Sequence, residues 1–237
     1  MVKNSAYISG IPIEAKEVIA SGKPGSRNNR FVKNYYVGKE LVGTRTYQQN
    51  GFIEYECTFK DGQRDGWEYE FDSAGSLHMA VPFRQGLEHG TARIWGNSGN
   101  LLGTYTKENG TGLFLYWGEF DGTAQLTVAS YSVNCVMHGT EYWFCWFQPG
   151  VLWKERSWQH GALNGIEREW NCPGELRHEF PKFWLGGQCI HQDEYITTSS
   201  NNPELPQYIP AEDQPIRSFP VEIAVYLPRL PHPDAKQ

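Results

Sequence analysis

Residues 51–99 read GFIEYECTFKDGQRDGWEYEFDSAGSLHMAVPFRQGLEHGTARIWGNSG, and they contain one 24-residue unit written twice in the same register. The glycines at positions 51, 62, 66 and 75 return at positions 75, 86, 90 and 99. The same spacing of 11, 4 and 9 residues recurs at positions 150, 161, 165 and 174. Glycine at a fixed phase of a fixed period indicates a repeat architecture.

Between the glycines, apolar and acidic residues alternate. Trp67, Tyr69 and Phe71 point one way along the chain, and Glu68 and Glu70 point the other way. A period of two residues is typical of a β-strand. Each unit is therefore predicted to form two short antiparallel strands, and the chain is predicted to be an all-β protein, an elongated single-sheet antiparallel β-meander built from ~24-residue repeats.

One glycine of each unit follows a turn-forming residue. These pairs are Asp65-Gly66, His89-Gly90, His138-Gly139 and Asn164-Gly165. Such pairs favour positive φ, which glycine tolerates and branched residues do not. We expect tight turns at these positions.

The phase of glycine and aromatic residues from Tyr47 to Gly174 resembles MORN repeats. In detail it is similar to the MORN variant of the YwqK-family proteins, which are named as antitoxins. The resemblance implies a non-catalytic bacterial antitoxin or immunity protein that neutralises a toxin by direct contact. The partner it implies is a protein, with the toxin encoded by a neighbouring gene as the candidate.

The repeat pattern divides the chain into three parts. Residues 1–30 do not fit the repeat and are interpreted as an N-terminal cap and linker, and residues 31–191 as the MORN-like repeat domain. Residues 192–237 form a proline-rich tail that we expect to be mostly extended. Residues 219–227 alternate as a strand would and are predicted to pair as an edge strand on the sheet. The alternative is a loose arm that binds a partner.

Composition narrows the functional classes. The net charge is −6, which argues against a nucleic-acid binder. No apolar run approaches about 18 residues, and the first residues lack a long apolar stretch, so neither a spanning helix nor a signal peptide is expected. The five cysteines are odd in number and include no C-x-x-C, which favours reduced thiols and a cytoplasmic protein. The sequence does not indicate an oligomeric state.

Catalytic signatures are missing from the sequence. It contains no G-x-G-x-x-G, G-x-x-x-x-G-K, H-E-x-x-H or G-x-S-x-G. His89 and His138 share a repeat position, but two repeats of sheet would separate them by roughly 19 Å, too far for one ion. We therefore expect no enzyme activity, no cofactor and no metal.

Aromatic residues are the strongest candidates for partner contact. A ring four residues before each repeat glycine forms a predicted column, made of Tyr47, Phe71, Trp95, Trp146 and Trp170. The column is either packing or a binding surface. Arg93 and Arg168 alternate onto the same face, where they either support the rings through cation–π contacts or contact a partner.

The repeat is irregular between positions 110 and 150, and aromatic residues cluster there. A broken repeat is either a tolerated insertion or a functional site. The predicted partner-binding residues are Trp117, Tyr142, Trp143, Trp146, Arg93 and Arg168. The runner-up function is a MORN-type structural scaffold or membrane-associated adaptor. A protein that binds membrane surfaces would carry a basic face, whereas this chain has 21 Lys and Arg and 27 Asp and Glu, so membrane association is not expected.

Overall fold

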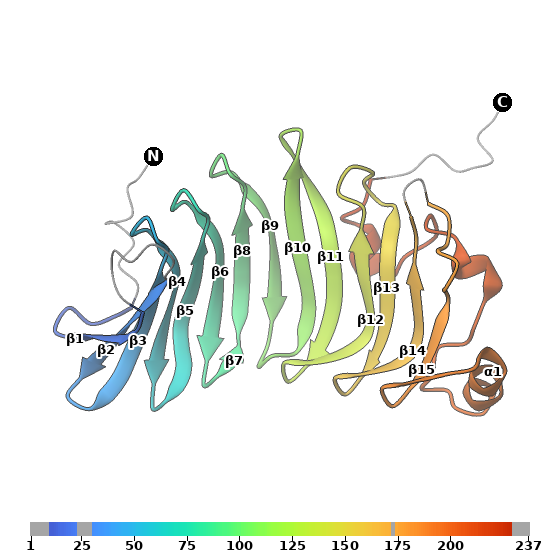
Figure 1. Cartoon of the computed structure of the whole chain (residues 1–237), viewed down its shortest axis with the longest axis horizontal. Helices are drawn as coiled ribbons and strands as arrows, with labels where there is room; N and C mark the ends of the chain where they lie inside the picture. Colours follow the sequence, from blue (N-terminus) through green and yellow to red (C-terminus); the bar gives the residue numbers. More distant parts are fainter. Residues whose placement is uncertain (1–9, 23–29, 172–173, 229–237) are drawn as a thin grey trace. The chain divides into compact units, whose positions relative to one another are not determined.

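Within each of two units, strands that follow one another in the sequence are antiparallel neighbours (Figure 1). The computed structural model describes residues 10–22, 30–171 and 174–228, and the chain divides into unit 1, Met1–Thr111, and unit 2, Gly112–Gln237. Unit 1 pairs its strands in the order β1-β2-β3-β4-β5-β6-β8-β9, with β7 beside β6. They are β1 (Lys16–Ser21), β2 (Phe31–Val37), β3 (Glu40–Tyr47), β4 (Ile53–Lys60), β5 (Gln63–Phe71), β6 (Leu77–Arg84), β7 (Leu87–Glu88), β8 (Gly90–Trp95) and β9 (Leu101–Lys107).

Unit 2 contains a second antiparallel sheet with its strands in sequence order. They are β10 (Gly112–Phe120), β11 (Thr123–Val133), β12 (Val136–Phe144), β13 (Leu152–Gln159), β14 (Ala162–Glu169), β15 (Lys182–Leu185) and β16 (Gln188–Ile190). The predicted all-β antiparallel meander is confirmed, but its strands divide between two sheets, one in each unit, and do not form the single sheet that was predicted. Because β1 pairs with β2, the sheet of unit 1 begins inside the segment 1–30 that was interpreted as a cap and linker.

The tight turns lie four residues before the predicted pairs, at Asp61-Gly62, Gln85-Gly86, Asn134-Cys135 and His160-Gly161. Asp61 and Gly62 have φ of 52° and 76°, as in the turns that suit the right-handed twist of a hairpin. Gly66 lies inside β5, where the pairing with β4 shifts register between Cys57 and Phe59. A Cβ at Gly66 would lie 2.4 Å from Thr58 Oγ1, so glycine is needed there for a bulge and a close strand approach, not for a turn.

The C-terminal part of the chain is more structured than the sequence suggested. Helix α1 (Gln192–Ser200) begins where the side chain of His191 accepts a hydrogen bond from the Asp193 backbone N–H. Tyr195 of α1 is fully buried against Phe183 and Ile166, at the β14–β15 end of the sheet of unit 2. A 3-10 turn, Pro210–Asp213, follows.

The edge strand predicted over 219–227 is wrong. Val221–Ala224 form the short helix α2, because the Pro220 carbonyl accepts hydrogen bonds from the N–H groups of Ile223 and Ala224. Proline fixes φ near the helical value and has no N–H for a strand ladder, so it starts a helical turn here. Of the alternating apolar residues, Ile223 is buried whereas Val221 and Val225 are exposed.

Residues 205–227, called here the C-terminal segment, run back along one face of the sheet of unit 2. In Figure 1 the orange-to-red chain passes from α1, beside β15, toward β12. A cross-strand row marks this covered face: Ala129 pairs with Tyr142, Tyr142 with Glu155, and Glu155 with Arg168. The C-terminal segment thus supplies the second layer that a single sheet needs to bury one face.

Candidate protein-binding surface

The six predicted partner-binding residues lie on different surfaces. Tyr142 and Arg168 belong to the covered face of unit 2, and Trp117, 6% exposed, packs edge-on against Tyr226 of the C-terminal segment with ring centroids 5.8 Å apart. Trp143 faces the other way, Trp146 lies in a turn, and Arg93 belongs to unit 1. Within unit 2, the structure therefore does not bring its five predicted residues together on one surface.

Arg168 is the centre of a buried ion network. Its Nη1 donates to Glu155 Oε1 at 2.5 Å, and its Nε donates to Asp213 Oδ1 at 2.7 Å. Arg217 of the C-terminal segment donates to the other oxygen of Glu155. Burial lowers the pKa of Arg217, with Tyr142 acting in the opposite direction. Charged side chains that are removed from water need such pairing. The network therefore stabilises the packing of the C-terminal segment on the sheet.

Aromatic contacts close the same face. The ring of Phe219 stands edge-on to Tyr142 and to Phe144, with centroid distances of 5.6 and 5.3 Å. The indole Nε1 of Trp170 donates to the Asp213 carbonyl oxygen at 2.8 Å. While the C-terminal segment is in place, Trp117 and Arg168 are buried and Tyr142 is half-buried against Phe219, so this face is internal packing and not a free contact surface.

Trp143 belongs to a half-buried ladder on the opposite face of unit 2. Its ring packs edge-on against Trp153 at 5.8 Å. Along the same ladder the indole Nε1 of Trp158 donates to Glu141 at 3.0 Å, and that of Trp184 donates to Glu167 at 3.1 Å. On this face Trp158 and Trp184 thus each donate a hydrogen bond to an acidic side chain of a neighbouring strand.

Trp146 does not occupy the ring column in which the sequence placed it. Equivalent turns are closed by one hydrogen bond, from Gln48 N to Phe52 O in unit 1 and from Cys145 N to Val151 O in unit 2. The turn of unit 2 is therefore two residues longer, and Phe144, not Trp146, corresponds to Tyr47. Because the inserted residues lengthen the turn and not the strand, Trp146 is carried beyond the sheet.

Three aromatic side chains meet at this end of unit 2 and are called here the turn patch: Phe120, Trp146 and Phe147. Trp146 is 61% exposed and Phe147 is 40% exposed. Trp146 packs edge-on against each of the other two rings at 5.3 Å. Large apolar rings held together in water are the usual anchors of a protein interface. Phe120 and Phe147 were missed in the sequence, although Phe147 adjoins Trp146 and Phe120 directly precedes the Asp121-Gly122 turn.

Unit 1 carries Arg93 and an open depression. The Arg93 guanidinium lies 5.6 Å from the ring centroid of Trp67, a cation–π arrangement on an exposed side chain. The depression, about 550 Å³, is lined by Arg30, Thr46, Glu54, Tyr55, Glu70, Phe71, Asp72, His78 and Asn97.

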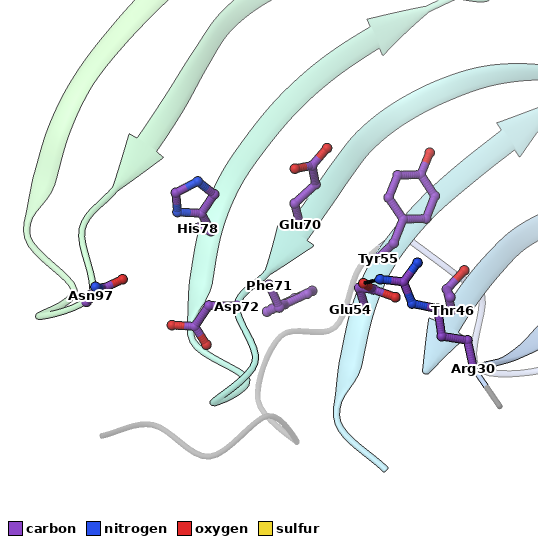
Figure 2. Close-up of a pocket in the computed structure, with 9 residues that line it drawn as sticks. All are labelled: Arg30, Thr46, Glu54, Tyr55, Glu70, Phe71, Asp72, His78 and Asn97. Carbon is purple, nitrogen blue, oxygen red and sulfur yellow. Dashed lines mark hydrogen bonds and ion pairs between the residues drawn. The ribbon is translucent and has the colours of Figure 1, made fainter. Parts of the chain in front are cut away.

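The depression is polar, and some of its charged side chains already pair with other groups. Figure 2 shows Tyr55, Glu70 and His78 along one side of neighbouring strands. Arg30 donates to Glu54 at 2.5 Å, and Asp72 accepts the N–H groups of Ala74 and Ser76 at the turn. Burial and the charge of Glu68 raise the pKa of Glu70. Within residues 10–22, 30–171 and 174–228, no cluster of three or more His, Cys, Asp or Glu is placed to hold a metal ion.

Comparison with known families and with curated proteins found no match for this chain. None of the helices in the described ranges has both the length and the apolar character needed to cross a bilayer.

Proposed function

We propose that this chain is a non-catalytic protein-binding module of the antitoxin or immunity type, and that the turn patch of unit 2 is its contact surface. The observation that carries the proposal is the exposure of Trp146 and Phe147 beside Phe120. Exposed aromatic side chains in contact with one another lose little conformational entropy on binding and bury a large apolar area. The resemblance to YwqK-family antitoxins makes a toxin in the cytoplasm the proposed partner.

The negative charge of unit 2 suits a partner with a positively charged surface. From Gly112 onward the sequence has 8 Lys and Arg against 15 Asp and Glu, a net charge of −7, so unit 2 carries all of the chain's negative excess. Complementary charge accelerates encounter, and aromatic anchors then slow dissociation. A toxin that acts on nucleic acid would present the positive surface that this arrangement suits.

The test begins with co-expression of the chain and the product of its neighbouring gene. Binding and rescue of growth are expected, and failure of both would refute the antitoxin assignment. Trp146→Ala is expected to weaken the complex by more than ~10-fold, or about 1.4 kcal/mol, without changing the thermal midpoint of unfolding.

Tyr131→Ala is the matched control, because Tyr131 is an aromatic residue of unit 2 that is 39% exposed near the other end of β11. Its affinity should change by less than ~2-fold. Equal losses in the two variants, or no loss in Trp146→Ala, would place the interface away from the turn patch.

A further inference from the structure

Unit 1 and unit 2 each hold a glutamate at the same point of the repeat. Glu56 is the fifth residue after Gly51, and Glu155 is the fifth after Gly150. Both side chains are 2% exposed. Glu155 lies between Tyr142 and Arg168 on the neighbouring strands, whereas Glu56 lies between Arg45 and Tyr69. Each site therefore has one glutamate between one arginine and one tyrosine. The arginine lies on the preceding strand in unit 1 and on the following strand in unit 2, and the tyrosine lies on the opposite side in each case.

The two glutamates differ in how fully their oxygens are paired. Arg168 pairs with one oxygen of Glu155, and Arg217 from the C-terminal segment pairs with the other. In unit 1, Arg45 donates to Glu56 Oε2, but within the described residues Glu56 Oε1 is buried and accepts no hydrogen bond. A buried carboxylate oxygen without a donor is costly, and the missing donor corresponds to Arg217.

The surroundings of Glu56 also correspond to those that hold Phe219. In unit 2 this ring packs on Tyr142 and Phe144. The equivalent positions in unit 1 are Arg45 and Tyr47, and Tyr47 stacks on Phe31 at 4.6 Å. An aromatic ring placed there would contact the Tyr47 ring and the Arg45 guanidinium.

On the same face of unit 1, next to Glu56, residues from outside the sheet already pack against the strands. A Cβ at Gly43 would lie 2.5 Å from Ile11 Cγ1, and one at Gly10 would lie 3.7 Å from Thr58 Cγ2. Thr58 is two residues beyond Glu56 on β4. Chain outside the sheet thus packs closely on this face without strand pairing, as the C-terminal segment does in unit 2.

We propose that unit 1 binds, around Glu56, an extended segment of a partner protein that carries an arginine followed two residues later by an aromatic residue. The arginine pairs with Glu56 Oε1 and the ring packs over Tyr47 and Arg45. This site belongs to unit 1 and the turn patch belongs to unit 2, so the chain has two contact surfaces of different chemistry, one apolar and one selective for arginine.

A peptide with the sequence QPIRSFP, copied from Gln214–Pro220 and blocked at both ends, is the probe. It is titrated into the ¹⁵N-labelled full chain and followed by amide chemical shifts. We expect shifts on β3 and β4, and affinity about 10-fold higher than for the control peptide QPIQSFP. Equal affinity of the two peptides would overturn the proposal.

Glu56→Gln is expected to lower the affinity for QPIRSFP about 10-fold and to abolish the difference between the peptides. If this variant does not fold, the comparison of the two peptides on the unaltered chain still decides. Shifts confined to unit 2 would mean exchange with the chain's own C-terminal segment and would overturn the proposal. Self-association that depends on Glu56 would identify a second copy as the occupant, with the same consequence. Trp146→Ala should leave peptide binding unchanged, which separates this site from the proposed antitoxin surface.

Discussion

Two glycines of unit 2 share a repeat position but have different surroundings. Gly139 and Gly165 both have positive φ, 73° and 133°. A Cβ at Gly165 would lie 2.4 Å from the Cβ of Ser157 and 2.9 Å from Pro206 Cγ, whereas a Cβ at Gly139 would meet nothing within 4 Å. Strain from φ acts at both positions, but a steric clash acts only at Gly165.

Alanine at these two glycines separates the clash from the strain. Gly165→Ala is expected to reduce the free energy of unfolding by more than ~2 kcal/mol, because β13 and Pro206 must shift. Gly139→Ala is expected to cost about 1 kcal/mol, from φ alone. Urea denaturation followed by tryptophan fluorescence measures both, and equal losses would contradict the close-approach explanation.

Glu70 should make unit 1 less stable as pH rises. Burial and the charges of Glu68 and Glu54 raise its pKa above the ordinary 4.5, while His78 acts in the opposite direction. Because the folded state then holds this proton more tightly than the unfolded chain does, stability falls as pH rises from about 4.5 through the raised pKa.

Glu70→Gln is therefore expected to raise the thermal midpoint by about 2 °C near pH 7 and to have less effect near pH 4.5. Thermal denaturation across this range measures the difference. Glu108→Gln, at an exposed position of unit 1, is the control and should change little. A lower midpoint for Glu70→Gln near pH 7 would show that Glu70 is stabilised as a carboxylate.

At the level of elements, the C-terminal segment is held to the sheet of unit 2 by an ion pair between residues that are distant in sequence. Arg217 and Glu155 are 62 residues apart in sequence, and Glu155 is 2% exposed. Arg217→Gln would leave Glu155 with one buried oxygen unpaired, so the free energy of unfolding should fall by about 3 kcal/mol.

An exposed ion pair of the same unit supplies the control. Arg177 pairs with Glu169 at the surface, and Arg177→Gln is expected to cost less than ~1 kcal/mol. Chemical denaturation of the full chain compares the two variants. Similar small losses would mean that the C-terminal segment does not depend on the buried pair.

The elements themselves differ in how far sequence could predict them. Strand alternation such as Trp67-Glu68-Tyr69 is local, so the meander was predictable. The turn glycine was not, because Gly62 and Gly66 both tolerate positive φ and only cross-strand geometry distinguishes a turn from a bulge. Trp146 was misplaced for a similar reason, since two extra residues can lengthen a strand or a turn.

The candidate site was less predictable than the fold. Trp146 was predicted to contact a partner and is exposed, but whether Tyr142 and Arg168 are covered depends on Phe219 and Arg217, which lie many residues away. No local pattern shows which face a distant segment will cover. The alternation over 219–227 pointed to a strand, and the preceding Pro220 was the signal against it.

At the level of the whole molecule, charge is divided unevenly between the units. Unit 1 has 13 Lys and Arg against 12 Asp and Glu, whereas unit 2 has 8 against 15. Anionic membranes attract clusters of basic residues, and they repel an acidic surface.

The full chain is therefore expected not to co-sediment with phosphatidylserine vesicles at about 0.15 M salt, where the Debye length is about 8 Å. Vesicles of neutral lipid are the control for apolar insertion of the turn patch. Sedimentation with anionic vesicles alone would favour the scaffold or adaptor function over a protein-binding antitoxin.

The place of the C-terminal segment in the chain has a consequence for synthesis. The covered face of unit 2, with Phe144, Glu155 and Arg168, is built from strands that leave the ribosome before the residues that shield them. Until Arg217 and Phe219 emerge, the nascent chain exposes to chaperones an apolar face on which Glu155 lacks one of its two arginine partners. Translation that stops before these residues would give a product with its sheet strands present and its second layer missing, which is a natural substrate for degradation.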